Sequence, residues 1–467
     1  MRNLLAFLTV LLMGAGMLAQ NKTIVFGYED IPQSLLVNPA ADMPQDFHAG
    51  LPGLSQVYLH GGSSGVSAFD IFQESSTDIN QRITEAIAGM NFRDFFTVNQ
   101  QLEILSAGWR NNKGDYWSAG LYQELDVLAY FPEDLADLAW EGNRNYIGRS
   151  FDLGQLSVTS EVLMVYHVGI SRQFNKNLRV GARAKLYSNI AHASSTGNQG
   201  TFVTTENPGT VNIYEHIVTN ADLEVRTSGI DAISEAGSPG KEVAKRAMLG
   251  GNLGVGVDLG ISYDWNRNWT FDASILDLGF VYHSNDVKRY TARGDYVLNG
   301  IEFIFPPLSD GQRTVDYYRR LTDDLDEAFP RDTLSTAYLQ MRPTKVNAAI
   351  SYGFGTFGEG EDCNCLNKES TRWRERLGLQ FFSVIRPRRP HMALSAFYYR
   401  RLTGFLSAKI AYTVDEYSAS NLGAGFAADI GPVNFYFTVD NILRYGNVAR
   451  AKNVSLQLGL NLKLSRE

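Results

Sequence analysis

The chain contains long segments in which apolar and polar residues alternate. In residues 252–265, "NLGVGVDLGISYDW", every odd-numbered residue from Leu253 to Trp265 is apolar or aromatic, and the residues between them are glycine, serine or aspartate. Successive side chains of a β-strand point to opposite faces, so this pattern predicts a strand with one apolar face. Residues 177–188 and 453–464 repeat it. These segments are longer than the usual globular strand of about five or six residues.

Strands of this length are typical of a membrane-spanning β-barrel, because a tilted strand needs about ten residues to cross a bilayer. A soluble β-sandwich also alternates, but its polar face is usually rich in Lys, Glu and Thr, whereas glycine is frequent on the polar face here. Such glycines favour a crowded or plugged lumen. We therefore predict an all-β fold, a transmembrane antiparallel β-barrel of about 14 strands with an N-terminal lumenal plug segment and short helices.

Short asparagine-rich turns connect several of the predicted strands. They lie at residues 111–115, 175–177 and 266–268, and their tightness is typical of the periplasmic rim of a barrel. The alternation changes parity at Ile275 and Leu276, which predicts a β-bulge there. Aromatic residues at strand ends, Tyr263, Trp265, Trp269 and Tyr282, predict an interfacial girdle.

The N-terminus predicts export. Arg2 precedes an apolar stretch that ends in small residues, so we expect residues 1–19 to be a signal peptide and residues 20–467 to form a single outer-membrane β-barrel domain. The expected location is the cell outer membrane, with its lipid as a partner. The composition agrees with this, with 43 Gly, 23 Tyr and 26 Phe, and the net charge of −8 gives no footprint for nucleic acid.

Several stretches lack the strand pattern. Residues 76–94 and the segment "FPEDLADLAWEGN" at 131–143 have helical spacing, and they lie either outside the barrel or folded into its lumen. Residues 203–247 and 284–343 are long and polar. We expect them to be long extracellular loops.

Enzyme-like motifs in the chain lack their required context. "GGSSG" around Ser63 has no recognisable acid and histidine partners, and "GFGTFG" at 353–358 is not followed by a helix. Cys363 and Cys365 have no further ligands nearby for zinc, and whether they form a disulfide stays open. We expect no enzyme, no catalytic residues, no cofactor and no metal site.

Two groups of residues are candidates for a site inside the barrel. Arg179, Arg183, Lys185 and Asp258 lie on polar strand faces and are predicted to line the lumen. Asn38-Pro39-Ala40 stands near the mature N-terminus, where the Asn-Pro pair favours extended or turn geometry. On its own, this tripeptide fits a surface turn.

A resemblance to a known group of barrels indicates a second structural role for Asn38-Pro39-Ala40. Asn38-Pro39-Ala40 behind a signal peptide, "LAWEGN" at 138–143, "DLG" turns at Asp258 and Asp277 and "DNIL" at 440–443 together resemble outer-membrane barrels of a domain-of-unknown-function type. These are related to FadL-like transporters and to the PorV and PorP/SprF barrels of type IX secretion. The resemblance implies that residues 20–60 form a hatch inside the barrel, with Asn38, Pro39 and Ala40 in a rigid turn. The ending "LKLSRE" departs from the terminal aromatic residue of many such barrels.

Two functions follow from this resemblance. The first is an accessory barrel that docks secreted or surface proteins, as in type IX secretion, and the long insertions favour it. The alternative is a FadL-like transporter that carries small hydrophobic molecules. Charges in the lumen suit both, because either barrel needs a polar interior.

Overall fold

The computed structural model describes residues 22–207, 214–298, 332–356 and 373–465. The expected signal peptide at residues 1–19 and the cysteines Cys363 and Cys365 lie outside these residues. Part of the expected loop at 284–343 also lies outside them.

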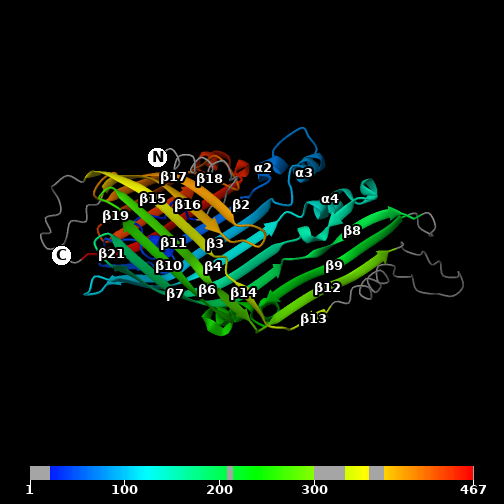
Figure 1. Ribbon diagram of the computed structural model, residues 1–467, viewed down its shortest axis with the longest axis horizontal. Helices are drawn as coiled ribbons and strands as arrows, with labels where there is room; N and C mark the ends of the chain where they lie inside the picture. The colour runs from blue at the N-terminus through cyan, green and yellow to red at the C-terminus, as the bar shows by residue number, and fades with distance from the viewer. Residues whose placement is uncertain (1–21, 208–213, 299–331, 357–372, 466–467) are drawn as a thin grey trace.

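The described residues form a closed antiparallel β-barrel of 14 wall strands, as the sequence predicts (Figure 1). Closure comes from the last strand, which pairs with the first, while the first also pairs with the second along the chain. The first wall strand is split into β1 and β2, and β14 (Tyr338–Met341) extends β15 along β11. The strands are β1 (Phe47–Gly50) with β2 (Gln56–Ser63), β3 (Phe95–Arg110), β4 (Tyr116–Tyr130), β6 (Val158–Gln173), β7 (Leu178–Ser195), β10 (Asn252–Asp264), β11 (Trp269–His283), β15 (Lys345–Thr356), β16 (Trp373–Val384), β17 (His391–Arg401), β18 (Leu406–Asp415), β19 (Asn421–Ile430), β20 (Val433–Asp440) and β21 (Asn453–Leu464).

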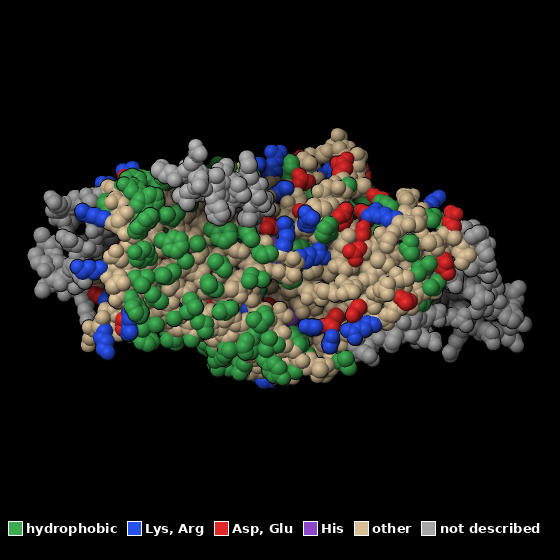
Figure 2. Space-filling model, in the orientation of Figure 1, with side chains coloured by type: hydrophobic (Ala, Val, Ile, Leu, Met, Phe, Trp, Pro, Cys, Tyr) green, Lys and Arg blue, Asp and Glu red, His purple; other side chains and the backbone are tan. Residues whose placement is uncertain are grey.

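An apolar belt surrounds the wall. On β10 the odd-numbered side chains from Leu253 to Tyr263 are 37% to 52% exposed, whereas Asp258 on the opposite face is fully buried. Ten residues of a strand tilted by about 40° rise about 25 Å, the height of a membrane barrel's apolar band. Figure 2 shows the hydrophobic side chains spread over this half of the molecule. The predicted girdle residues Trp265, Trp269 and Tyr282 are also exposed, at the ends of the belt.

The predicted turns and the predicted bulge are confirmed. In each asparagine-rich turn the first asparagine side chain accepts hydrogen bonds from backbone N–H groups two or more residues ahead, which fixes the turn. On β11 the register shifts so that Val257 faces Leu278 and Leu259 faces Ile275. Asp258 therefore stands opposite two residues, Leu276 and Asp277, and Asp277 has a positive φ of 58°. The "DLG" motifs are thus parts of strands rather than turns.

A further group of strands continues the sheet of the wall beyond the belt (Figure 1). We call it the extension. It joins β7 through β9. Its strands carry charges on both faces, so they lack the apolar alternation of the wall. The expectation of loops over residues 203–247 and 284–343 is therefore wrong where these strands lie. They are β5 (Ser150–Asp152), β8 (Gln199–Glu206), β9 (Tyr214–Ser228), β12 (Val287–Leu298) and β13 (Asp332–Leu334).

The helices are short and lie outside the lumen, apart from one in the N-terminal segment. The predicted helices near 76–94 and 131–143 are confirmed as α3 (Ile79–Ala88) and α4 (Glu133–Glu141). Both stand beside the barrel mouth, where Trp140 of α4 donates a hydrogen bond to Thr84 of α3 (Figure 1). Among the described residues, no helix is long and apolar enough to cross a bilayer. The others are η1 (Pro32–Leu36), α2 (Ala68–Phe72), η2 (Arg144–Tyr146), η3 (Leu153–Gln155), α5 (Ile230–Ser234), α6 (Pro239–Lys245), η4 (Arg246–Gly250) and η5 (Ile442–Arg450).

Candidate functional site

Residues 22–46 fill the barrel, and we call them the plug. Most of their side chains are buried, and several form one apolar cluster with residues of β15 to β20. The expected hatch at residues 20–60 is longer than this, because residues 47–63 contribute β1 and β2 to the wall. The cluster contains Ile24, Val25, Phe26, Tyr28, Ile31 and Val37 of the plug, with Ala349, Phe397, Tyr399, Ala411, Ala427 and Tyr436 of the wall.

Asn38, Pro39 and Ala40 form a buried turn that rests against two glycines of the wall. The Asn38 side chain accepts a hydrogen bond from the backbone N–H of Ala40 at 3.0 Å, which closes the turn. Gly181 of β7 and Gly260 of β10 are direct partners in the sheet. A Cβ at Gly181 would lie 2.2 Å from the Pro39 carbonyl, and one at Gly260 would lie 2.2 Å from Asn38 Oδ1. The turn therefore needs glycine at both wall positions.

A second pair of glycines makes room for the start of the plug. A Cβ at Gly423 or Gly425 of β19 would lie within 2.8 Å of the Ile24 side chain. These positions and the seat of Asn38 explain why glycine is frequent on the inner strand faces: side chains there would exclude the plug.

Polar groups of the wall hold the plug backbone. The plug has little regular secondary structure, so its buried carbonyl groups need donors from elsewhere. Lys409 Nζ donates to the Phe26 carbonyl at 2.6 Å, and Ser274 Oγ donates to the Val37 carbonyl at 2.6 Å. Lys463 Nζ donates to the Asp30 carbonyl at 3.0 Å.

Ion pairs also connect the plug with the wall. Arg179 of β7, one of the predicted lumen residues, pairs with Asp42 at 2.6 Å. Arg376 of β16 pairs with Glu29 at 2.6 Å. Every connection described here is non-covalent and side-chain mediated, and none replaces a bond of the strand ladders.

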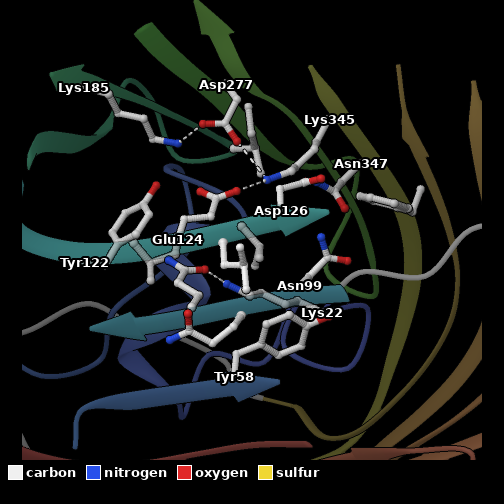
Figure 3. Close-up of a pocket in the computed structure, with 17 residues that line it drawn as sticks. Lys22, Tyr58, Asn99, Tyr122, Glu124, Asp126, Lys185, Asp277, Lys345 and Asn347 are labelled. Carbon is white, nitrogen blue, oxygen red and sulfur yellow. Dashed lines mark hydrogen bonds and ion pairs between the residues drawn. The ribbon is translucent and has the colours of Figure 1, made fainter. Parts of the chain in front are cut away.

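A network of buried charges lies on the wall next to the plug (Figure 3). Lys185 bridges Asp258 at 2.9 Å and Asp277 at 2.6 Å. Lys345 of β15 bridges Asp277 at 2.9 Å and Glu124 of β4 at 3.3 Å. These side chains are at most 13% exposed.

The network continues to both sides. Arg183 pairs with Asp258 at 3.1 Å and also donates to the Leu35 carbonyl of the plug. Arg342 pairs with Glu124 at 3.1 Å. Because positive side chains surround these carboxylates, they form a salt-bridge lattice. Among the described residues, no group of three or more His, Cys, Asp or Glu side chains is arranged to hold a metal ion.

The structure thus brings three of the predicted lumen residues, Arg183, Lys185 and Asp258, into one network and places Arg179 apart, against the plug. Sequence reasoning missed Asp277 and Lys345. The parity change before Asp277 was a usable signal, because the bulge turns this side chain toward Lys185. Lys345 gave a weaker one, as a charged residue at the start of an alternating segment.

A small cavity separates the plug from this network. It has a volume of about 40 Å³, enough for a few water molecules. Sites for small organic ligands usually measure about 300–1,000 Å³. This cavity is therefore too small to hold such a ligand. The cavity lining combines charged side chains such as Lys22, Glu124 and Lys345 with apolar ones such as Leu36 and Phe382.

Comparisons with known proteins assign the chain to a family. The model of a family described as "Family of unknown function (DUF5723)" matches residues 39–440. No curated protein is significantly similar in sequence.

Several solved structures are partly similar, among them two described as toluene transporters and one described as a FadL homologue. The toluene transporter TbuX of Ralstonia pickettii is 10% identical with a TM-score of 0.41, over 93% of this chain and 94% of its own. A Pseudomonas aeruginosa FadL homologue is 11% identical with a TM-score of 0.41, over 96% and 100%. The toluene transporter TodX of P. putida is 9% identical with a TM-score of 0.39, over 93% and 95%. These values are too low to indicate a shared function.

Proposed function

The chain belongs to DUF5723, a family of unknown function, and from its structure we propose that it is a non-enzymatic outer-membrane β-barrel that passes small molecules through a lumen gated by its plug. One observation carries this proposal: the plug fills a wall that closes without it. β21 pairs with β1 and β2, so every wall strand has two neighbours whether or not the plug is present. A closed ladder is what a barrel needs to stay folded in lipid.

The polar contacts of the plug, unlike those of its apolar cluster, are of a kind that water can replace. Hydrogen bonds from Lys409, Ser274 and Lys463 end on plug carbonyls. The bond from Ser274 contributes about 0.5–1.5 kcal/mol net and each bond from a charged lysine about 1.5–3 kcal/mol, since the separated groups are hydrated. The lumen surface left behind carries Arg, Lys, Asp and Glu side chains. A shift of the plug therefore opens a path that water enters readily.

The lining of the cavity favours an amphipathic solute. It carries charges of both signs, lysines beside Glu124, Asp126 and Asp277, and Leu36 and Phe382 offer apolar surface next to them. A molecule with a charged or hydrogen-bonding group and an apolar body matches both. The small hydrophobic ligand expected from the sequence would fit this path best if it carried such a group.

A second function, docking of secreted or surface proteins, rests on the extension. This sheet projects past the apolar belt and carries exposed charged side chains (Figure 2). For example, the Arg293–Asp222 pair is more than half exposed on average. The sheet offers a regular surface outside the membrane, which a bare channel does not require. A role alongside type IX secretion stays a prediction from the resemblance.

Removal of the plug tests the gating proposal. The deletion has to end at residue 46, because removing residues 47–60 as well would take out most of the first wall strand. We expect the variant lacking residues 22–46 to keep heat-modifiable gel mobility and to make liposomes permeable to small sugars, in contrast to the full-length protein. Asp222→Ala in the extension is the matched control and should leave permeability unchanged. A folded deletion variant as tight as the full-length protein would overturn the proposal.

A further inference from the structure

A compact helical segment lies on the outside of the barrel wall. It comprises residues 229–251 between β9 and β10, with α5, α6 and the single π-type turn η4. We call it the elbow. It is the short green helical segment that protrudes below the wall in Figure 1.

Buried polar contacts fix the base of the elbow to the wall. Arg246 is 1% exposed, and its Nε donates to the Ile190 carbonyl of β7 at 2.8 Å. Ser188 of the same strand donates to the Arg246 carbonyl at 2.5 Å, and Tyr166 of β6 donates to the Ala247 carbonyl at 3.1 Å. These bonds hold η4 in a defined position.

The tip of the elbow presents apolar side chains outward. Met248 is 77% exposed and Leu249 is 43% exposed. Leu249 also has a positive φ of 65°, which is uncommon for a bulky residue and costs of order 1–3 kcal/mol. On helices α5 and α6, Ile230 and Val243 are 39% and 37% exposed. In water, exposing Met248 and Leu249 would not offset the cost of the strained backbone. The exposed apolar tip therefore points to an apolar environment around it.

The apolar belt is continuous with this tip. The elbow runs directly into β10, where Leu253 is the first exposed belt residue, and Leu253 pairs with Tyr282 of β11. Beside Tyr282, Leu339 and Met341 of β14 are more than half exposed. Figure 2 shows the hydrophobic side chains of the belt reaching without a break to the lower protrusion. This edge of the belt is the one farthest from the asparagine-rich turns.

We propose that the elbow is a lipid-binding foot that inserts Met248 and Leu249 among the acyl chains at the outer boundary of the bilayer. Its partner is the membrane lipid that already covers the belt. Lys241 and Lys245 on α6 are exposed next to the tip, as expected for a segment in the interface between acyl chains and headgroups. The elbow thereby fixes the depth and tilt of the barrel. This inference rests on the membrane placement in the proposed function, but not on gating.

Depth-dependent quenching tests this proposal. In a Cys363→Ser, Cys365→Ser background, Met248→Cys is labelled with the fluorophore NBD and the protein is reconstituted into phosphatidylcholine vesicles that contain spin-labelled lipid. Leu253→Cys reports the belt and Arg293→Cys reports water. We expect the label at Met248 to be quenched severalfold more than the label at Arg293, and most strongly by lipid labelled near the headgroup.

The two control labels distinguish a failure of the lipid-binding foot from a failure of the membrane barrel. A label at Met248 that is no more quenched than the one at Arg293, while the label at Leu253 is quenched, would overturn the lipid-binding foot. Loss of quenching at Leu253 as well would instead remove the membrane barrel on which it rests.

A second variant asks whether the two tip residues drive insertion. With the label at Val243→Cys, the change Met248→Ser, Leu249→Ser should abolish quenching, and Met248→Leu should preserve it. Heat-modifiable mobility in detergent checks that the barrel is folded. Full quenching in the serine variant would contradict the role of the tip.

Discussion

The lumen and the extension both contain Arg–Asp ion pairs, but the pair in the lumen is buried and the pair on the extension is exposed to water. Arg183 and Asp258 bridge neighbouring strands inside the barrel with side chains 1% and 0% exposed, whereas Arg293 and Asp222 bridge neighbouring strands of the extension at 58% and 50% exposure. Inside the barrel little water can replace the partner of an unpaired charge, so loss of one member is costly. On the extension, water hydrates the charge that has lost its partner, so the loss costs little. The lumen charges therefore determine how the interior fits together, and the exposed charges mainly keep the extension hydrated.

The largest difference in the free energy of unfolding between the two regions is expected from a substitution of Asp277. Asp277→Asn leaves Lys185 and Lys345 with one carboxylate fewer in a buried site and should reduce the free energy of unfolding by about 3–5 kcal/mol. Asp222→Asn should cost less than about 1 kcal/mol. Urea unfolding of both variants in the same lipid measures the two values. Equal losses would show that burial does not distinguish the two regions.

The outer wall gives the next largest contrast. Arg in place of Val257, midway along the belt on β10, should cost about 2–4 kcal/mol if this site lies near the bilayer midplane. Val297→Arg on β12 of the extension is the matched control, since Val297 is similarly exposed but outside the belt. The free energy of folding into vesicles measures both changes. A tolerated Val257→Arg would contradict the placement of the belt in lipid.

A single methyl group tests how tightly the plug is seated. Gly260→Ala forces a Cβ against Asn38 Oδ1, and overpacking of this kind costs about 1–3 kcal/mol. Gly61→Ala in β2 meets open space and serves as the control. We expect protease to reach the plug faster only in the Gly260 variant. Identical cleavage rates would mean that the turn does not depend on its seat.

The smallest expected effect is a pH dependence of local stability that is confined to the extension. Burial raises the pKa of Glu224, but hydrogen bonds from Arg289 and Arg226 outweigh it, so the pKa lies below its usual value. A lowered carboxyl pKa stabilises the fold above the unfolded value of about 4.3, and this contribution is lost as the pH falls through the folded pKa. The protection factors for amide exchange in β9 and β12 should therefore fall below about pH 4. Glu224→Gln should remove this pH dependence, and an unchanged profile would contradict the assignment.

Local patterns in the sequence predict which segments form wall strands. They do not predict which residues of distant strands contact one another. Alternation alone identified β10, and the parity change at Ile275 located the bulge, because both depend on neighbouring residues only. The extension was misread as loops because β9 and β12 carry charges on both faces, and a strand without an apolar face has no periodic signal.

The lumen contacts depend on register between distant strands. Lys345 meets Asp277 only because β15 pairs with β11, and Glu124 reaches it from β4 across the lumen. The length of the plug was misjudged for a similar reason, since β1 and β2 are recognisable as wall only once β21 lies beside them.

A reversible lock on the plug tests the gate most directly. A Cβ at Gly425 would lie 2.8 Å from Ile24 Cγ2, and Ile24→Cys removes the second γ branch of that side chain, so Ile24→Cys and Gly425→Cys can be joined by a disulfide in a Cys363→Ser, Cys365→Ser background. Uptake of small amphipathic solutes into proteoliposomes is then measured before and after reduction. The gated lumen predicts no uptake in the oxidised protein and uptake once the disulfide is reduced. The same rate in both states would contradict the central claim that the plug controls the path.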